Sequence, residues 1–87
     1  MKELRRIVDD YPDDRVGLVI DIGHVGVLRT DPISEIRSAG ARLCGTHIHD
    51  VDFSSPDGDH RAPTRGGFDW DPILKAFEEI EYRPVDL

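Results

Sequence analysis

The chain has 87 residues, of which 33% are charged and 38% hydrophobic, and its formal net charge at pH 7 is −7. This acidic balance argues against nucleic-acid binding, because the chain has no basic stripe that could displace counterions from a phosphate backbone. No run approaches the ~18 apolar residues of a membrane span and no secretory leader follows Met1, so we expect a cytoplasmic protein without membrane contact. The length suits one small domain or a piece of a larger one, and the lone Cys44 is expected to be a buried core residue in a reducing compartment.

The first predicted elements are a helix and a buried strand. Apolar residues recur at helical spacing over residues 2–11, so we expect an amphipathic helix with its apolar stripe buried. Residues 16–21 are apolar and rich in β-branched side chains, which is typical of a strand covered on both faces. This run ends in Asp21 and His24, and a short glycine-containing connection is expected to follow His24.

A second helix and a second strand follow. Asp31 is a typical N-cap, Pro32 suits the first helical position and Gly40 suits the end, so these residues predict a helix between them. The apolar run that comes next predicts a strand over residues 42–49.

The last part of the chain predicts a long connection, a helix and the start of a third strand. Residues 51–68 show no hydrophobic periodicity, and loops longer than about 12–15 residues tend to be functional or disordered. Because this connection contains His60 and Arg61, we predict that it is functional. A helix is expected over residues 71–80, with Ile73, Leu74, Phe77 and Ile80 on its buried face, and a strand is expected over 82–87.

Helices and strands thus alternate, which indicates parallel strands joined by right-handed crossovers. We therefore expect the α/β fold class, with residues 1–87 forming a single domain that corresponds to part of a (β/α)8 barrel, a fold of typically ~250 residues. Such a piece leaves sheet faces and edges uncovered, so it would need another chain or the missing half of the barrel to cover them.

Polar residues at the strand ends suggest a metal site. The carboxyl ends of parallel strands, where α/β proteins place their chemistry, carry Asp21 and His24 on one strand, and His47 and His49 on one face of the next. Neighbouring strands lie about 4.8 Å apart, so a carboxylate and an imidazole at their ends can share one divalent ion. Mixed oxygen and nitrogen ligands suit Mn, Co, Zn or Mg. The alternative is that Asp21 caps a turn and the histidines make ordinary hydrogen bonds.

Three stretches carry a family resemblance. VGLVIDIGHV is similar to a "D-x-G-H" strand end, THIHD to an "H-x-x-D" strand end, and DGDHRAPTRGGFDWDPILKAFEEIEYRPV to a "DHR-x-PG-x-G-x-x-DW" loop and helix. In this order the motifs resemble the xylose isomerase-like TIM-barrel superfamily, which includes sugar isomerases and epimerases and DNA-repair enzymes of the endonuclease IV type. The resemblance covers nearly the whole chain and implies the last three βα units of that barrel.

The resemblance implies a metal-dependent isomerase or epimerase and a role for each polar residue. Asp21 and His47 would be metal ligands, from the sixth and seventh barrel strands. His24 would hydrogen-bond oxygens of the substrate, a sugar or sugar phosphate. His60 and Arg61 would lie in the loop over that substrate.

Three further residues receive supporting roles. His49 corresponds to a variable position of the family, and Asp50 would orient a neighbouring side chain. Both would therefore support the metal ligands without binding the metal themselves. Trp70 corresponds to the aromatic residue at the start of the last helix, where we expect it to pack.

The sequence also departs from the superfamily, whose enzymes bind the metal with two further glutamates. The motifs place one of these before Met1 and the other after Leu87, and Glu3 does not replace the first because it lies in a helical pattern. Those glutamates would transfer the proton at the adjacent carbon of the sugar. We therefore expect this chain alone to have the binding half of a site and little or no turnover.

Two alternatives stay open. In a metal-dependent phosphodiesterase of the endonuclease IV type, His24, His60 and one of Asp57 or Asp59 would help to bind extra zinc ions. In a non-catalytic barrel fragment, the histidines would be relics and the exposed strand edges would pair with another chain.

Overall fold

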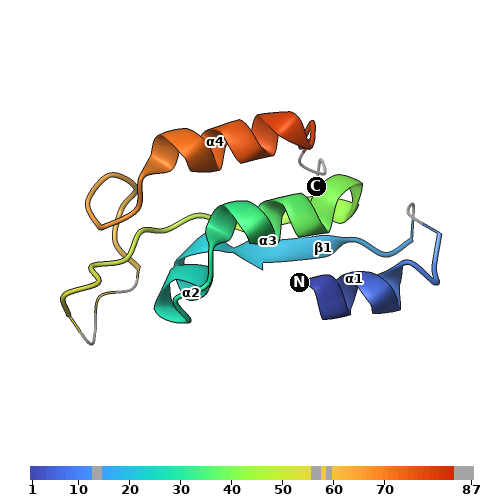
Figure 1. Ribbon diagram of the computed structural model, residues 1–87, viewed down its shortest axis with the longest axis horizontal. Helices are drawn as coiled ribbons and strands as arrows, with labels where there is room; N and C mark the ends of the chain where they lie inside the picture. The colour runs from blue at the N-terminus through green and yellow to red at the C-terminus, as the bar shows by residue number, and fades with distance from the viewer. Residues whose placement is uncertain (13–14, 56–57, 59, 84–87) are drawn as a thin grey trace.

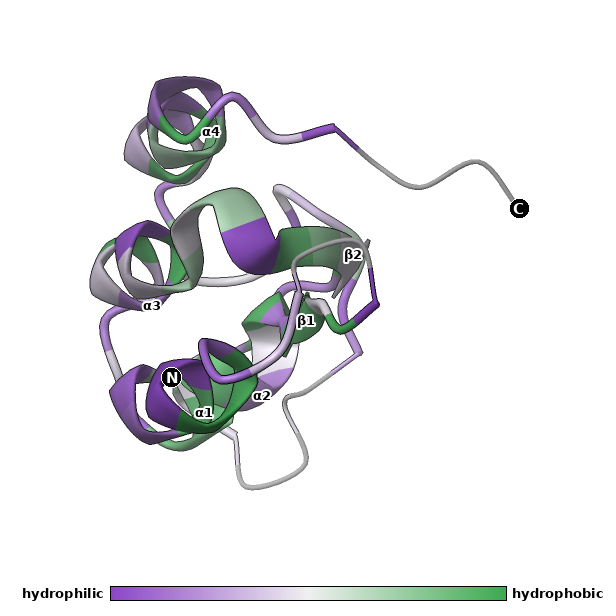
Figure 2. Cartoon of the chain, turned by 90° about the vertical axis from the view of Figure 1, so that its right-hand side faces the viewer, coloured by the Kyte–Doolittle hydropathy of each residue, from purple (hydrophilic) through white to green (hydrophobic). Residues whose placement is uncertain are grey.

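The structure, a computed structural model, describes residues 1–12, 15–55, 58 and 60–83. Its elements follow in the order α1 (Lys2–Val8), β1 (Leu18–Asp21), α2 (Ile22–Val27), α3 (Pro32–Ala39), a 3-10 turn (Gly40–Arg42), β2 (Leu43–His47) and α4 (Trp70–Glu79). In Figure 1, α3 lies along β1 and next to α4. Figure 2 shows α1, α3 and α4 in a row on one side of the two strands. These helices therefore cover one face of the sheet.

Among the described residues, β1 and β2 form a two-stranded parallel sheet. The register pairs Leu18 with Leu43 and Asp21 with His47, with one irregularity after Leu18. The chain returns from β1 to β2 through α2 and α3, which is the helical crossover that parallel strands need. The expected α/β architecture of parallel strands and crossover helices is confirmed, and it is consistent with part of a (β/α)8 barrel.

The core lies between the sheet and the row of helices. Leu18 and Ile20 of β1 are 5% and 2% exposed and belong to one buried cluster with side chains of α3 and α4. Val19, which points the other way, is 56% exposed. The expectation that residues 16–21 are covered on both faces is therefore wrong for the described part of the chain, because α1, α3 and α4 lie on one side of the sheet and Val19 faces the other.

The first helix is shorter and less buried than expected. α1 ends at Val8, which is its buried residue, whereas Leu4 and Ile7 are 50% and 61% exposed. α1 packs against α3, where the Arg5 guanidinium donates a hydrogen bond to the Ala39 carbonyl at 2.7 Å. The predicted apolar stripe of this helix therefore remains largely exposed in the described structure.

Two other elements differ from their predicted bounds. Residues 22–27 form the helix α2, although the end of the strand and, after His24, a connection were expected there. The last helix begins at Trp70, because the Asp69 carboxylate accepts a hydrogen bond from the Asp71 amide and is the N-cap in place of Asp71. Leu74, which was expected to be buried, is 55% exposed.

The remaining expectations concern the third strand, the cysteine and the membrane. Tyr82 and Arg83 are not in a strand, and the rest of the predicted strand, residues 84–87, lies outside the described residues. Cys44 is half-buried rather than buried, with its Sγ 3.5 Å from the Leu18 carbonyl oxygen. None of the helices in the described part of the chain has the length and apolar character of a membrane span.

Candidate functional site

The carboxyl ends of β1 and β2 bring a carboxylate and an imidazole together. Asp21 and His47 are the last residues of their strands and are register partners, so both lie at the same edge of the sheet. The Oδ2 atom of Asp21 is 3.6 Å from the Nδ1 atom of His47. Two ligand atoms that each lie about 2.1 Å from a tetrahedral ion are about 3.4 Å apart. The spacing of this pair therefore fits two ligands of one ion.

The two oxygens of Asp21 have different partners. Oδ1 accepts a hydrogen bond from the His24 amide at 2.9 Å, which makes Asp21 the N-cap of α2, and it also contacts the ring of His49. Oδ2 faces the rings of His24 and His47, whose Nδ1 atoms are 3.3 and 3.6 Å away. Asp21 thus caps a helix, as the alternative interpretation expected, and still directs one oxygen toward two exposed imidazoles.

Asp21 is ionised at neutral pH. Burial by itself raises the pKa of this carboxyl group, but the hydrogen bonds from the His24 amide and the His49 ring, and the charges of these histidines, lower its pKa below the usual value. A carboxylate that keeps its charge is a competent ligand for a divalent cation.

His49 lies between Asp21 and the connection that follows β2. The residue is 9% exposed, its Nε2 is 2.5 Å from Oδ1 of Asp21, and its Nδ1 accepts a hydrogen bond from the His60 amide at 2.9 Å. Because Nδ1 is an acceptor, the proton of the neutral ring must lie on Nε2, from which it is donated to Asp21. The ring also stacks on that of His60, with centroids 4.4 Å apart.

His24, His49 and His60 form a cluster of imidazoles with one ring nitrogen each within 4.8 Å of the others. This arrangement could hold a transition metal, since imidazole is a common zinc ligand. However, both ring nitrogens of His49 already have hydrogen-bond partners, so it could bind an ion only by giving up the His60 amide or Asp21. The Asp21 and His47 pair requires no such exchange.

Asp50 is a fully buried carboxylate that the connection surrounds. Its Oδ1 accepts hydrogen bonds from the amides of Val51 and Phe68, and its Oδ2 accepts from the Thr64 amide and the Trp70 indole. Burial by itself raises the pKa of Asp50, but these hydrogen bonds, from the Trp70 indole above all, lower its pKa below the usual value. The sequence indicated a supporting role for Asp50, but not that its partners lie up to 20 residues along the chain.

The remaining site candidates lie nearby. Arg61 pairs with Asp50 through the main chain, and the side chains of His60 and Arg61 are exposed. Asp57 and Asp59, the candidates for extra zinc ligands, lie outside the described residues.

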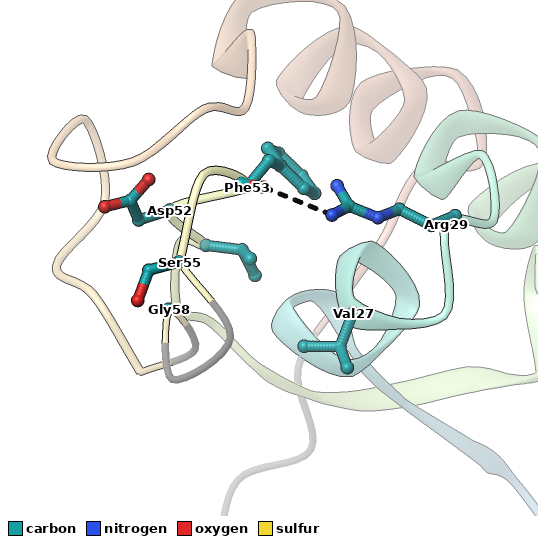
Figure 3. Close-up of a pocket in the computed structure, with 7 residues that line it drawn as sticks. Val27, Arg29, Asp52, Phe53, Ser55 and Gly58 are labelled. Carbon is teal, nitrogen blue, oxygen red and sulfur yellow. Dashed lines mark hydrogen bonds between the residues drawn. The ribbon is translucent and has the colours of Figure 1, made fainter.

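A pocket between the end of α2 and the connection was not expected from the sequence. It has a volume of about 230 Å³ and lies between Val27, Arg29 and residues that follow β2 (Figure 3). The Arg29 guanidinium lies 4.7 Å from the centroid of the Phe53 ring and donates a hydrogen bond to the Phe53 carbonyl at 3.2 Å. Its charge therefore stabilises the connection, and no spacing motif in the sequence marks this contact.

Comparisons with known proteins extend the resemblance. The sequence model of the family described as "Xylose isomerase-like TIM barrel" matches residues 1–86. The uncharacterized protein y4fM of Sinorhizobium fredii is 39% identical over 83 residues, which are 95% of this chain and 26% of that protein. The chain thus spans about a quarter of the length of this relative. No solved structure matches the chain significantly.

Proposed function

Because the chain belongs to the xylose isomerase-like TIM-barrel family, we propose that it forms part of a divalent-metal site that isomerises or epimerises a sugar or sugar phosphate. The observation that carries this proposal is the 3.6 Å separation of Asp21 Oδ2 and His47 Nδ1 at the carboxyl edge of the parallel sheet. In α/β barrels this edge is where catalytic groups from several strands meet.

The donor set fits the metal. A carboxylate oxygen and imidazole nitrogens suit Mn, Co, Zn or Mg better than a cation that prefers thiolates. Asp21 and His47 would bind the ion, and it would polarise the carbonyl and hydroxyl oxygens of an open-chain sugar. His24 is close enough to Asp21, at 3.3 Å, to act beside them as a further nitrogen ligand or as a donor to a substrate oxygen.

The chain's own residues would bind and orient the substrate. The exposed imidazoles of His24 and His60 and the guanidinium of Arg61 offer hydrogen bonds to hydroxyl or phosphate oxygens at this edge. In the described part of the chain, β1 and β2 do not end in a glutamate. The groups that move the proton would therefore come from other strands of a complete barrel.

The experiment is a titration of the chain with Co²⁺, followed by visible absorption and by isothermal titration calorimetry. We expect Asp21→Asn and His47→Gln each to weaken Co²⁺ binding by about tenfold or more, since each removes one ligand. Asp31→Asn is the matched control, because Asp31 caps α3 as Asp21 caps α2, whereas among the described residues no hydrogen bond or ion pair links Asp31 to a histidine. Equal Co²⁺ affinity in all four proteins would refute the proposed site.

A second candidate function is favoured by the three imidazoles that converge within 4.8 Å. Several zinc ions at one edge would suit a phosphodiesterase of the endonuclease IV type. The net charge of −7 gives the chain little attraction for a nucleic-acid backbone, so we rank this function second. Zinc-dependent cleavage of a duplex with an abasic site, by a full-length relative, would reverse the ranking.

Two apolar surfaces of the described structure lack a cover, and both suggest a partner. Val19, on the face of the sheet turned away from the helices, is 56% exposed, and an apolar groove of about 420 Å³ lies on the helix side, between β2 and α4, beside Ile48, which is 44% exposed. We propose that further barrel strands, from a longer protein or from another chain, cover both surfaces. If they did so without a functional site, the chain would be the non-catalytic module that the sequence left open.

A further inference from the structure

Arg29 occupies a backbone position where glycine is usual. The Arg29 amide donates to the Gly26 carbonyl at 2.9 Å and the Thr30 amide donates to the Val25 carbonyl at 3.0 Å, so α2 ends in a Schellman motif. In this motif Arg29 takes the left-handed conformation, with a φ of 58°, which favours glycine because a β-carbon is strained there. An arginine held in this conformation points to a function of its side chain.

The Arg29 guanidinium is held in place without a carboxylate. Its Cζ lies 4.7 Å from the centroid of the Phe53 ring, and among the described residues the one acceptor of its N–H groups is the Phe53 carbonyl, at 3.2 Å. The nearby Asp52 carboxylate accepts from the Ser54 amide and hydroxyl instead, and in Figure 3 it points away from Arg29. Arg29 is therefore a positioned cation whose remaining donors can serve a ligand.

The pocket beside this cation has apolar and firmly packed walls. Val27 and Val51 line it together with Phe53 (Figure 3). The Phe53 ring packs edge-to-face on Phe68, with centroids 5.4 Å apart, and a β-carbon at Gly67 would lie 2.3 Å from its Cδ2. Beside apolar walls, the attraction between a guanidinium and an anion is screened less than in open water.

We propose that this pocket is a binding site for a phosphate group, with Arg29 as its ligand. A guanidinium presents its N–H groups in a fork that matches two oxygens of a phosphate. A phosphate monoester carries about −1.5 to −2 charges at neutral pH, so it gains more than a carboxylate does from one unpaired cation. The pocket volume of about 230 Å³ has room for a phosphate and the first atoms attached to it.

The place of the pocket deepens the proposed function. His24 and Val27 lie one turn apart on α2, so the pocket begins on the side of the helix that carries this exposed imidazole. Arg29 follows His24 by five residues, which is about 7.5 Å of helix rise. Three single bonds of an extended chain span about 3.5 Å, so the phosphate of an open-chain pentose lies roughly 6–7 Å from the carbonyl group. The ligand is then the distal phosphate of a sugar whose carbonyl end lies at Asp21 and His47, and this part rests on the proposed function.

The pocket is tested without a metal, by following NMR signals of the ¹⁵N-labelled chain during a titration with inorganic phosphate at constant ionic strength. We expect saturable shifts of the Arg29 Nε–Hε signal and an affinity at least fivefold weaker in Arg29→Gln. Arg6→Gln is the matched control, because it removes the same charge from an exposed arginine of α1. Arg29→Gly should also lose the phosphate site, and it keeps the helix end because glycine suits the left-handed position.

Two results of this titration would overturn the proposal. The first is an equal phosphate affinity in the unmodified chain and in Arg29→Gln, or shifts that do not saturate. The second comes from a parallel titration with acetate, which we expect to bind at least threefold more weakly than phosphate. Acetate that binds as tightly as phosphate would assign the pocket to carboxylates instead.

The link to the strand ends is tested separately, with ribose 5-phosphate in the presence of Co²⁺. We expect this probe to bind at least tenfold more tightly than inorganic phosphate, because both of its ends are held. His47→Gln should remove this gain, and Arg29→Gln should remove it without changing the Co²⁺ affinity. Ribose 5-phosphate that binds no better than inorganic phosphate would overturn the link. If the chain does not bind Co²⁺, the metal site and the link are both refuted, whereas the titration without metal still decides the phosphate site.

Discussion

The Nδ1 atom of His47 lies 3.6 Å from the Oδ2 atom of Asp21, across the last register pair of β1 and β2. The other oxygen of Asp21 is already engaged by the His24 amide and the His49 ring. Oδ2 is therefore the oxygen that an arriving cation would meet. The separation depends on the register of two parallel strands, which pairs Asp21 with His47.

Substitution of Asp21 separates its two roles. Asp21→Ala removes the N-cap of α2 and should lower the free energy of unfolding by about 0.5–2 kcal/mol, whereas Asp21→Asn keeps a good cap and should change it by much less. Both variants should bind Co²⁺ at the proposed site more weakly, by about tenfold or more. Urea unfolding followed by circular dichroism measures the first effect. A loss of stability in Asp21→Asn as large as that in Asp21→Ala would contradict the assignment of roles.

The low pKa of Asp50 predicts how stability depends on pH. Its hydrogen bonds favour the ionised form, so the stabilisation is fully present above the pKa of the unfolded carboxyl, about 3.9, and is lost as the pH falls through the lower folded value. In Asp50→Asn, the free energy of unfolding should be lower at every pH, and this decrease at acid pH should be missing. Urea midpoints between pH 6 and pH 2.5 measure it. Parallel acid profiles of the two proteins would show that Asp50 does not titrate as we expect.

Gly23 is required because the His49 ring occupies the space where a β-carbon would lie. A β-carbon at Gly23 would come within 1.7 Å of that ring, so Gly23→Ala should expel His49 from Asp21 and destabilise the fold by about 1–3 kcal/mol. Gly45→Ala is the control, because its β-carbon would meet Val19 at an ordinary 3.4 Å. The His49 ring signals in NMR spectra report the displacement directly. Unchanged His49 signals in Gly23→Ala would disprove the close approach.

The two faces of β1 should respond differently to substitution. Ile20 is 2% exposed, so Ile20→Val should lower the free energy of unfolding by about 0.5–1.5 kcal/mol. Val19 is 56% exposed, so Val19→Thr should change it by no more than about 0.5 kcal/mol and should weaken whatever association of the chain this open face supports. Urea unfolding and sedimentation velocity measure the two effects. A larger loss of stability from Val19→Thr would mean that the open face is covered in solution.

Much of the fold follows from local signals in the sequence. Asp31 and Pro32 begin α3 as predicted, and the apolar runs before Asp21 and His47 form the two parallel strands. Caps and strand periodicity involve residues a few positions apart, so their physics is contained in short stretches of chain. The parallel arrangement then places the two strand ends at one edge, which is why Asp21 and His47 could be paired before any coordinates were known.

The tertiary structure alone decided which groups support that pair. His49 lies between Asp21, 28 residues earlier in the chain, and the His60 amide, 11 residues later. Asp50 accepts hydrogen bonds from groups up to 20 residues further along the chain. Such contacts depend on the path of the connection after β2, which no periodicity specifies. Exposure of Val19 and Leu74 was likewise decided by where the helices pack, because an apolar side chain is buried only if another element reaches it.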